Sequence, residues 1–141
     1  MEEGEAIMEE LKKFILSCGY FFIATIDGDQ PRVRPFAAVN IFEGKLYIMT
    51  GKFKNVSKQI EKNPKVEICA ISPVGDEWVR VSGTLVRDER YEAKADLLSK
   101  FPSLSAYFKP DDDRTEVLYF KDAVASYYTF DYNKEPRVVK F

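Results

Sequence analysis

Short runs of β-branched and aromatic residues joined by tight turns are the feature that most limits how this chain can fold. The run at 20–26 is followed by Asp-Gly, the strongest short signal for a β-hairpin, and residues 32–42 are predicted to form the returning strand. A second tight turn at 43–45 leads directly into a third run at 46–50. Pro35 lies inside the second run, which implies an edge position, a bulge, or an N–H group that no neighbour needs.

The rest of the chain continues this pattern. Residues 78–88 alternate, which places Val79, Val81 and Leu85 on one face of a strand and Trp78 on the other. Further strands are expected at 65–72, 115–121 and 125–132, with a strand-like tail at 136–141. Helices are expected at 3–17, 55–62 and 89–101, with one more helical turn near 103–108. The 141 residues therefore predict a single domain, mainly β with an α+β character: a barrel of six or more antiparallel strands with peripheral helices.

Composition removes several classes of function. The chain has no histidine, so it lacks the base of the usual Ser-His and Cys-His pairs and the commonest metal ligand. Two distant cysteines, Cys18 and Cys69, cannot form a zinc site and fit a reduced cytoplasmic compartment, although a disulfide between them stays open. A net charge of −2 gives no basic field for nucleic acid, and neither a signal peptide nor a membrane span is expected. If the protein performs chemistry, a bound cofactor is expected to supply the reactive group.

The segment TGKFKNVSK at 50–58 carries an unusual distribution of charge. Lys52, Lys54 and Lys58 gather at a predicted helix start, and the first acidic residue after them is Glu61. Helix N-termini attract anions, because free N–H groups and the macrodipole make that end partly positive. The cluster therefore predicts an anion site, with a phosphate group as its ligand. The alternative is that the lysines are simply solvated.

Neighbouring polar side chains complete the predicted site. Asn55 is expected to cap the helix, and the Ser57 hydroxyl is expected to face outward beside the lysines. Thr50 adds a hydroxyl from the end of the preceding strand, and Arg34 adds a planar fork suited to phosphate. Arg32 shares a strand face with Arg34 by alternation, so it is either a second phosphate contact or part of a surface ion pair.

Three segments together carry a resemblance to a known family. They are IATIDGDQPRVRPFAAV, KLYIMTGKFKNVSKQIEKNPKVEI and WVRVSGTLV. In combination they resemble the pyridoxamine 5′-phosphate oxidase-like family, the FMN-binding split β-barrels, over roughly residues 5 to 132. The resemblance implies a homodimer with two FMN molecules in clefts between the protomers. The eleven Phe and eight Tyr residues are consistent with such an interface, because they exceed what one small barrel needs inside.

The resemblance also implies roles for particular residues. The FMN phosphate would be held by Arg34, Thr50, Lys54, Asn55, Ser57 and Lys58, with Lys52 and Arg32 as further candidates. The isoalloxazine ring would lie against the second and third strands, at Val33, Pro35, Phe36, Ile48 and Met49. Trp78 would lie near the ring, either in its own protomer or in the partner. Core or interface packing is the alternative role for this indole.

The chain also departs from true pyridoxamine phosphate oxidases. Val39 stands where those enzymes carry a Lys, and no His is present to hold their substrate. It is more similar to small bacterial or archaeal flavoproteins of the superfamily, among them proteins likened to nitroimidazole reductases. The expected function is an FMN-dependent oxidoreductase that passes electrons from a nicotinamide donor to a small acceptor. A non-catalytic binding module for FMN or the deazaflavin F420, and a flavin-free regulatory domain, are the alternatives.

Overall fold

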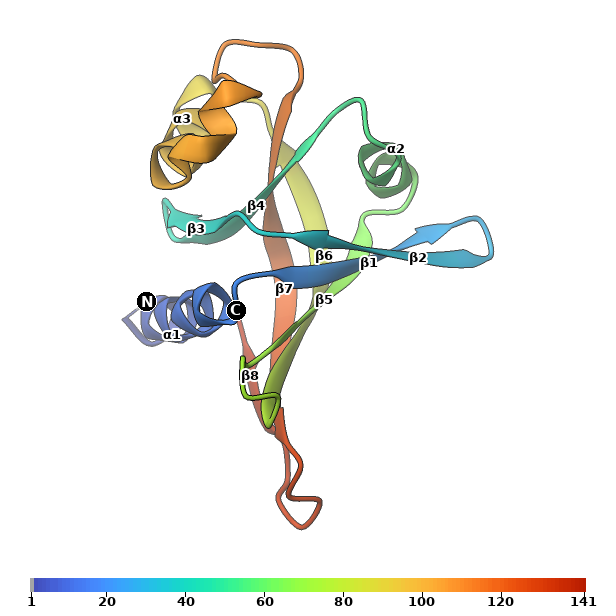
Figure 1. Cartoon of the computed structure of the whole chain (residues 1–141), viewed down its shortest axis with the longest axis vertical. Helices are drawn as coiled ribbons and strands as arrows, with labels where there is room; N and C mark the ends of the chain where they lie inside the picture. The colour runs from blue at the N-terminus through green and yellow to red at the C-terminus, as the bar shows by residue number, and fades with distance from the viewer. Residues whose placement is uncertain (1) are drawn as a thin grey trace.

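The computed structural model describes residues 2–141, which form one eight-stranded antiparallel sheet and three α-helices (Figure 1). The strand order is β2-β1-β5-β6-β7-β4-β3, with β8 paired to β7. The strands are β1 (Phe21–Asp27), β2 (Gln30–Phe36), β3 (Val39–Phe42), β4 (Lys45–Gly51), β5 (Lys65–Ile71), β6 (Glu77–Asp88), β7 (Thr115–Thr129) and β8 (Arg137–Lys140). The helices are α1 (Glu2–Cys18), α2 (Asn55–Lys62) and α3 (Tyr91–Lys100), followed by the 3₁₀ turn η1 (Pro102–Ala106). The predicted antiparallel split barrel with peripheral helices is confirmed.

The sheet is split between β2 and β3, which are consecutive in sequence but form its two edges. The prediction of a single strand over 32–42 is therefore wrong. Ala38 and Val39 are both buried, yet Ala38 packs beneath α3 whereas Val39 packs in the barrel core. Neighbouring residues of a strand face opposite sides of the sheet, so both sides are covered at this point. It is also the point at which the chain changes its pairing partner, because β2 pairs with β1 whereas β3 pairs with β4. Pro35 is on the edge strand, which is one of the three alternatives that its position implied.

The two predicted hairpin turns are present. In the first, Asp27 pairs with Gln30, so two residues connect β1 to β2, and Gly28 has a φ of 66°. In the second, Glu43 and Gly44 have φ values of 50° and 74° between β3 and β4. Positive φ at these positions matches the right-handed twist of the paired strands. Arg34, on the returning strand β2, contacts Gln59 of α2.

The two strands predicted at 115–121 and 125–132 are one strand, β7, and this prediction is also wrong. Both halves pair with β6, and the register shifts between Ser82 and Thr84. Asp122, with a φ of 53°, lies on β7 near this irregularity. A bulge of this kind bends a strand without ending it. In sequence, the polar pair at 121–122 resembles a turn because a bulge and a turn favour similar residues.

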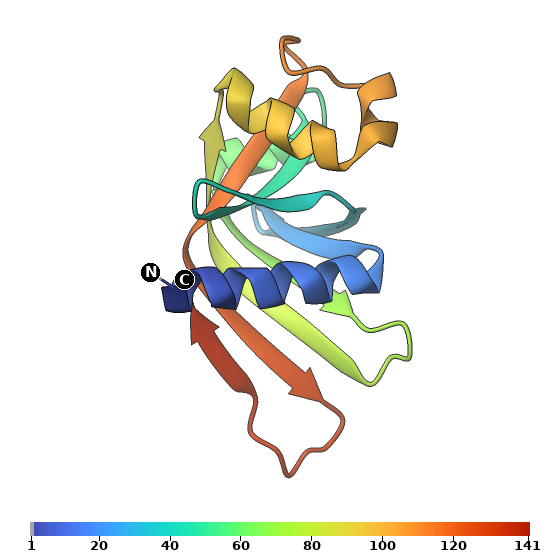
Figure 2. The same cartoon turned by 90° about the vertical axis from the view of Figure 1, so that its left-hand side faces the viewer.

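Two apolar clusters hold the elements together. The larger one fills the barrel and includes Leu11 and Ile15 of α1 and Val56 and Ile60 of α2. The second lies between α3 and the sheet and includes Leu97. Figure 2 shows α1 running across the side of the barrel, with α3 at the upper end and the β7–β8 hairpin at the lower end. Burial of one face of α2 leaves its lysines on the opposite face, toward solvent.

The structure also tests the alternation on β6 and the open question of a disulfide. On β6, Val79, Val81 and Leu85 are buried, as the alternation predicted, whereas Trp78 is half-buried on the other face. Cys18 and Cys69 are both free thiols, so no disulfide joins them. Within residues 2–141, no helix is long and apolar enough to span a bilayer. The same residues contain no grouping of His, Cys, Asp and Glu suited to a metal ion.

Candidate functional site

A cationic pocket of about 1110 Å³ lies between the β1–β2 hairpin and α2. Five cationic side chains line it against one acidic side chain, Asp27, which forms an exposed ion pair with Arg32 at 3.1 Å. The pocket therefore has a surplus of four positive charges in a chain whose net charge is −2. The cations are Arg32, Arg34, Lys54, Lys58 and Lys62, and Asn55 and Gln59 also line the pocket.

Arg34 is the most firmly held cation of this pocket, and all its hydrogen-bond acceptors are neutral. Its Nη1 donates to the Ile23 carbonyl at 3.2 Å and to Thr25 Oγ1 at 2.8 Å, and its Nη2 donates to Gln59 Oε1 at 2.7 Å. Partial burial is the main cause that lowers the pKa of Arg34, and the nearby positive charge of Arg32 lowers it further. A guanidinium stays protonated despite such a shift, so this charge is partly desolvated. Within residues 2–141 it has no carboxylate partner.

The beginning of α2 adds further positive potential. Lys54 is the N-cap residue, its side chain makes no capping bond, and the first turn contains no acidic residue. The predicted capping by Asn55 is therefore wrong, since Asn55 is the first helical residue. Lys54 and Lys58 are exposed at the pocket, and neither forms an ion pair within residues 2–141. Helix dipole and lysines thus act in the same direction.

Two predicted hydroxyls lie in the interior instead of lining the pocket. Ser57 is 2% exposed, so the expectation that its hydroxyl faces outward is wrong; its Oγ lies 3.5 Å from Arg87 Nη2. Thr50 is also buried, and its Oγ1 has no hydrogen-bond partner among the residues that the structure describes. Arg87 pairs with the fully buried Glu116, which lies opposite Thr50 on β7. The helical period explains this placement, because Ser57 lies three residues before the buried Ile60 and so faces the same side of α2.

Other residues expected near FMN are spread over different surroundings. Lys52 is directed away from the pocket to an ion pair with Glu89, with 2.7 Å between Nζ and Oε2. Val33 lines the cationic pocket, whereas Phe36, Ile48 and Met49 are buried in the two apolar clusters. Pro35 lies beside Phe22 on β1. The structure therefore brings together Arg34, Lys54, Asn55, Lys58, Arg32 and Val33, but not the other predicted residues.

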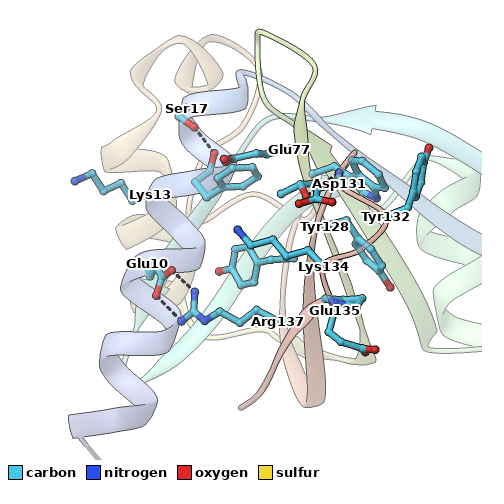
Figure 3. A pocket seen from close by; sticks show the side chains of 15 residues that line it. Glu10, Lys13, Ser17, Glu77, Tyr128, Asp131, Tyr132, Lys134, Glu135 and Arg137 are labelled. Atoms are coloured by element: carbon cyan, nitrogen blue, oxygen red, sulfur yellow. Dashed lines mark hydrogen bonds and ion pairs between the residues drawn. The ribbon is translucent and has the colours of Figure 1, made fainter.

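Trp78 lines a second pocket, the aromatic pocket, of about 820 Å³ (Figure 3). Its indole stacks on Tyr128 with 5.4 Å between ring centroids and an interplanar angle of 9°. An ion pair between Glu10 of α1 and Arg137 of β8 joins two walls of this pocket. Burial raises the pKa of Tyr127, also in the lining, to about 12, so its phenol stays neutral at physiological pH. The two pockets share no lining residue.

Sequence reasoning missed two residues of the cationic pocket region, Thr25 and Gln59. Thr25 is 2% exposed, and its hydroxyl donates to Gln59 Oε1 at 2.6 Å. Thr25 follows Phe21 and Ile23 on the inward face of β1, so alternation alone marks it as a polar group that needs an internal partner. Gln59 carries no such signal, because a glutamine within a helix is usually solvated.

Comparisons with known proteins agree with this architecture. Residues 7–128 match the family described as pyridoxamine 5′-phosphate oxidase. A NimC/NimA family protein from Clostridium acetobutylicum is 39% identical, with a TM-score of 0.90, over 97% of this chain and 94% of that protein. No curated protein gives a match.

More distant solved structures share the fold alone. A pyridoxamine 5′-phosphate oxidase-related, FMN-binding protein from Nostoc punctiforme is 16% identical with a TM-score of 0.60, over 96% of this chain and 94% of that one. A heme-binding protein from Mycobacterium smegmatis is 15% identical with a TM-score of 0.71, over 94% of this chain and 56% of that one. The family match over residues 7–128 and the relative at 39% identity show that the chain belongs to the pyridoxamine 5′-phosphate oxidase-like family of split β-barrels.

Proposed function

We propose that the protein binds FMN with the phosphate group in the cationic pocket, and that it acts as an oxidoreductase. The observation that carries this proposal is the surplus of four positive charges around Arg34, whose hydrogen-bond acceptors are all neutral. Like charges gathered around a partly desolvated guanidinium are unfavourable without an anion. A phosphate dianion makes each of these interactions favourable, and the donors of arginine suit its oxygens.

The composition of the chain is compatible with chemistry that such a cofactor supplies. When bound, FMN supplies the redox chemistry at its flavin ring, so the chain need not provide a nucleophile or a general base. This agrees with the absence of histidine. The chain itself provides the phosphate anchor and the cleft, and we propose a nicotinamide donor and a small electron acceptor. Val39, where pyridoxamine phosphate oxidases carry a Lys, is buried in the core, which argues against pyridoxamine 5′-phosphate as substrate.

A homodimer forms part of the proposal. The outer face of β2, β1, β5 and β6 exposes apolar side chains, including Val33, Phe22 and Ile71, and Trp78 neighbours Ile71 on this face. The face runs from Val33 in the cationic pocket to Trp78 in the aromatic pocket. A two-fold axis through it can place the aromatic pocket of one protomer near the cationic pocket of its partner. Trp78 would then contact the flavin bound mainly by the partner. Sedimentation should give the mass of two chains.

The test separates three functions. A purified protein with flavin absorbance, and with FMN identified by mass spectrometry, supports the cofactor, whereas a colourless protein that cannot be reconstituted with FMN refutes it. Bleaching by NADH or NADPH without oxygen supports a reductase. A yellow protein that no nicotinamide reduces is instead a binding module, and mass spectrometry distinguishes FMN from F420 in that case.

A further inference from the structure

The amide of Gln59 lies at the centre of the hydrogen-bond network behind the cationic pocket. Its Oε1 accepts from Arg34 Nη2 at 2.7 Å and from Thr25 Oγ1 at 2.6 Å. Thr25 Oγ1 in turn accepts from Arg34 Nη1 at 2.8 Å. Two donors converge on one atom of the amide, which fixes that atom as the oxygen. The three side chains come from α2, β1 and β2, so the network ties the helix to the hairpin.

This orientation has a consequence for the pocket. With its oxygen occupied, Gln59 has its Nε2 group and two N–H donors on the other side of the amide. Gln59 lines the cationic pocket, so its amide borders the space that an anion would occupy. The amide also holds the guanidinium of Arg34 without neutralising it, which a carboxylate in the same place would do.

We propose that Gln59 is a positioning residue that selects for a doubly charged phosphate group, by fixing the guanidinium of Arg34 while leaving its charge uncompensated. This inference rests on the proposed function, since it concerns the same pocket. Thr25 supports the arrangement, because its hydroxyl bridges the amide oxygen and the guanidinium. A neutral amide is essential to the proposal, whereas a purely structural link between helix and hairpin works equally well with a carboxylate.

The experiment replaces the amide by a carboxylate of nearly equal size. Gln59→Glu retains both acceptor bonds, so thermal stability without ligand should stay equal to that of the wild type or rise. Affinity for FMN, measured by quenching of flavin fluorescence, should fall at least about thirtyfold, equivalent to about 2 kcal/mol. Stabilisation by inorganic phosphate in a thermal-shift assay should disappear. The control is Gln30→Glu, which changes the only other glutamine of the chain, an exposed residue in the β1–β2 hairpin. It should change neither the affinity for FMN nor the stabilisation by phosphate by more than about twofold.

The outcomes separate this inference from the proposed function. If Gln59→Glu binds FMN and phosphate as the wild type does, the role of Gln59 is wrong while FMN binding stands. If the wild type binds phosphate but not FMN, and the variant loses phosphate, the positioning role stands and the cofactor is wrong. If the wild type binds neither, both are overturned. Equal losses of stability and affinity in Gln59→Glu would indicate a structural role only.

Discussion

Replacing Arg34 by alanine should weaken FMN binding far more than replacing any one of the three pocket lysines. An arginine side chain has five N–H donors, and three of those of Arg34 are used within the protein. Two donors remain for a phosphate. Hydrogen bonds to charged groups contribute about 1.5–3 kcal/mol each. The loss of one bond or more therefore predicts a Kd that rises about tenfold to a hundredfold.

The comparison with Lys58 makes this prediction specific. Lys58 is exposed, so its charge near the helix N-terminus should contribute only about 0.3–1 kcal/mol, and Lys58→Ala should raise the Kd about two- to fivefold. Lys65→Ala, which removes an exposed lysine outside the pocket, serves as the control. Fluorescence titration with FMN measures all three variants. Equal Kd values for the wild type and Arg34→Ala, or a larger effect of Lys58→Ala, would refute the reasoning.

Three further predictions concern the interface and the stability of the fold. Phe22→Asp on the outer sheet face should give monomers in sedimentation, whereas Val74→Asp in the exposed β5–β6 turn should leave the dimer intact. The neighbouring guanidinium of Arg90 lowers the pKa of Asp88 to about 2. The ionised Asp88 therefore contributes at most about 2 kcal/mol to the free energy of unfolding, and this contribution is present above about pH 4 and lost toward pH 2. In denaturant unfolding at pH 5 and at pH 2, Asp88→Asn should lose less stability between the two pH values than the wild type does. Arg87→Met leaves the buried carboxylate of Glu116 unpaired and should cost about 3–5 kcal/mol, of which the double variant with Glu116→Gln should recover most; equal stability of the single and double variants would contradict this.

Local pattern was sufficient to predict most elements of the fold. Helix α2 begins and ends where the sequence predicts, because Asn63-Pro64 stops it and its buried face has a clear helical period. The hairpin turns follow from Gly28 and Gly44. The strands that were predicted incorrectly depend on pairing partners. Whether 32–42 is one strand or two is decided by which edge of the barrel each half meets, and this information lies in distant segments.

The candidate site likewise contains residues that local sequence patterns predict and residues that they do not. Lys54, Lys58 and Arg34 were predicted because their charges are visible in sequence, and the pocket brings them together. Lys52 was also a candidate, but it pairs with Glu89 outside the pocket. The directions of side chains within the first turn of α2 were not predicted correctly, since a shift of one residue turns a side chain by about 100° around a helix axis. Ser57 was therefore expected to face outward, whereas it lies on the inner side of α2 and is buried. The bond between Thr25 and Gln59 spans 34 residues, so no local pattern reveals it.

The most direct measurement compares FMN with riboflavin, which has the same flavin ring and ribityl chain but no phosphate. Titration of the wild-type apoprotein at low salt should give an affinity for FMN at least about a hundredfold higher than for riboflavin, because the phosphate is expected to contribute about 3 kcal/mol or more. The difference should shrink as salt rises. Equal affinities for the two flavins would contradict the assignment of the cationic pocket as a phosphate anchor.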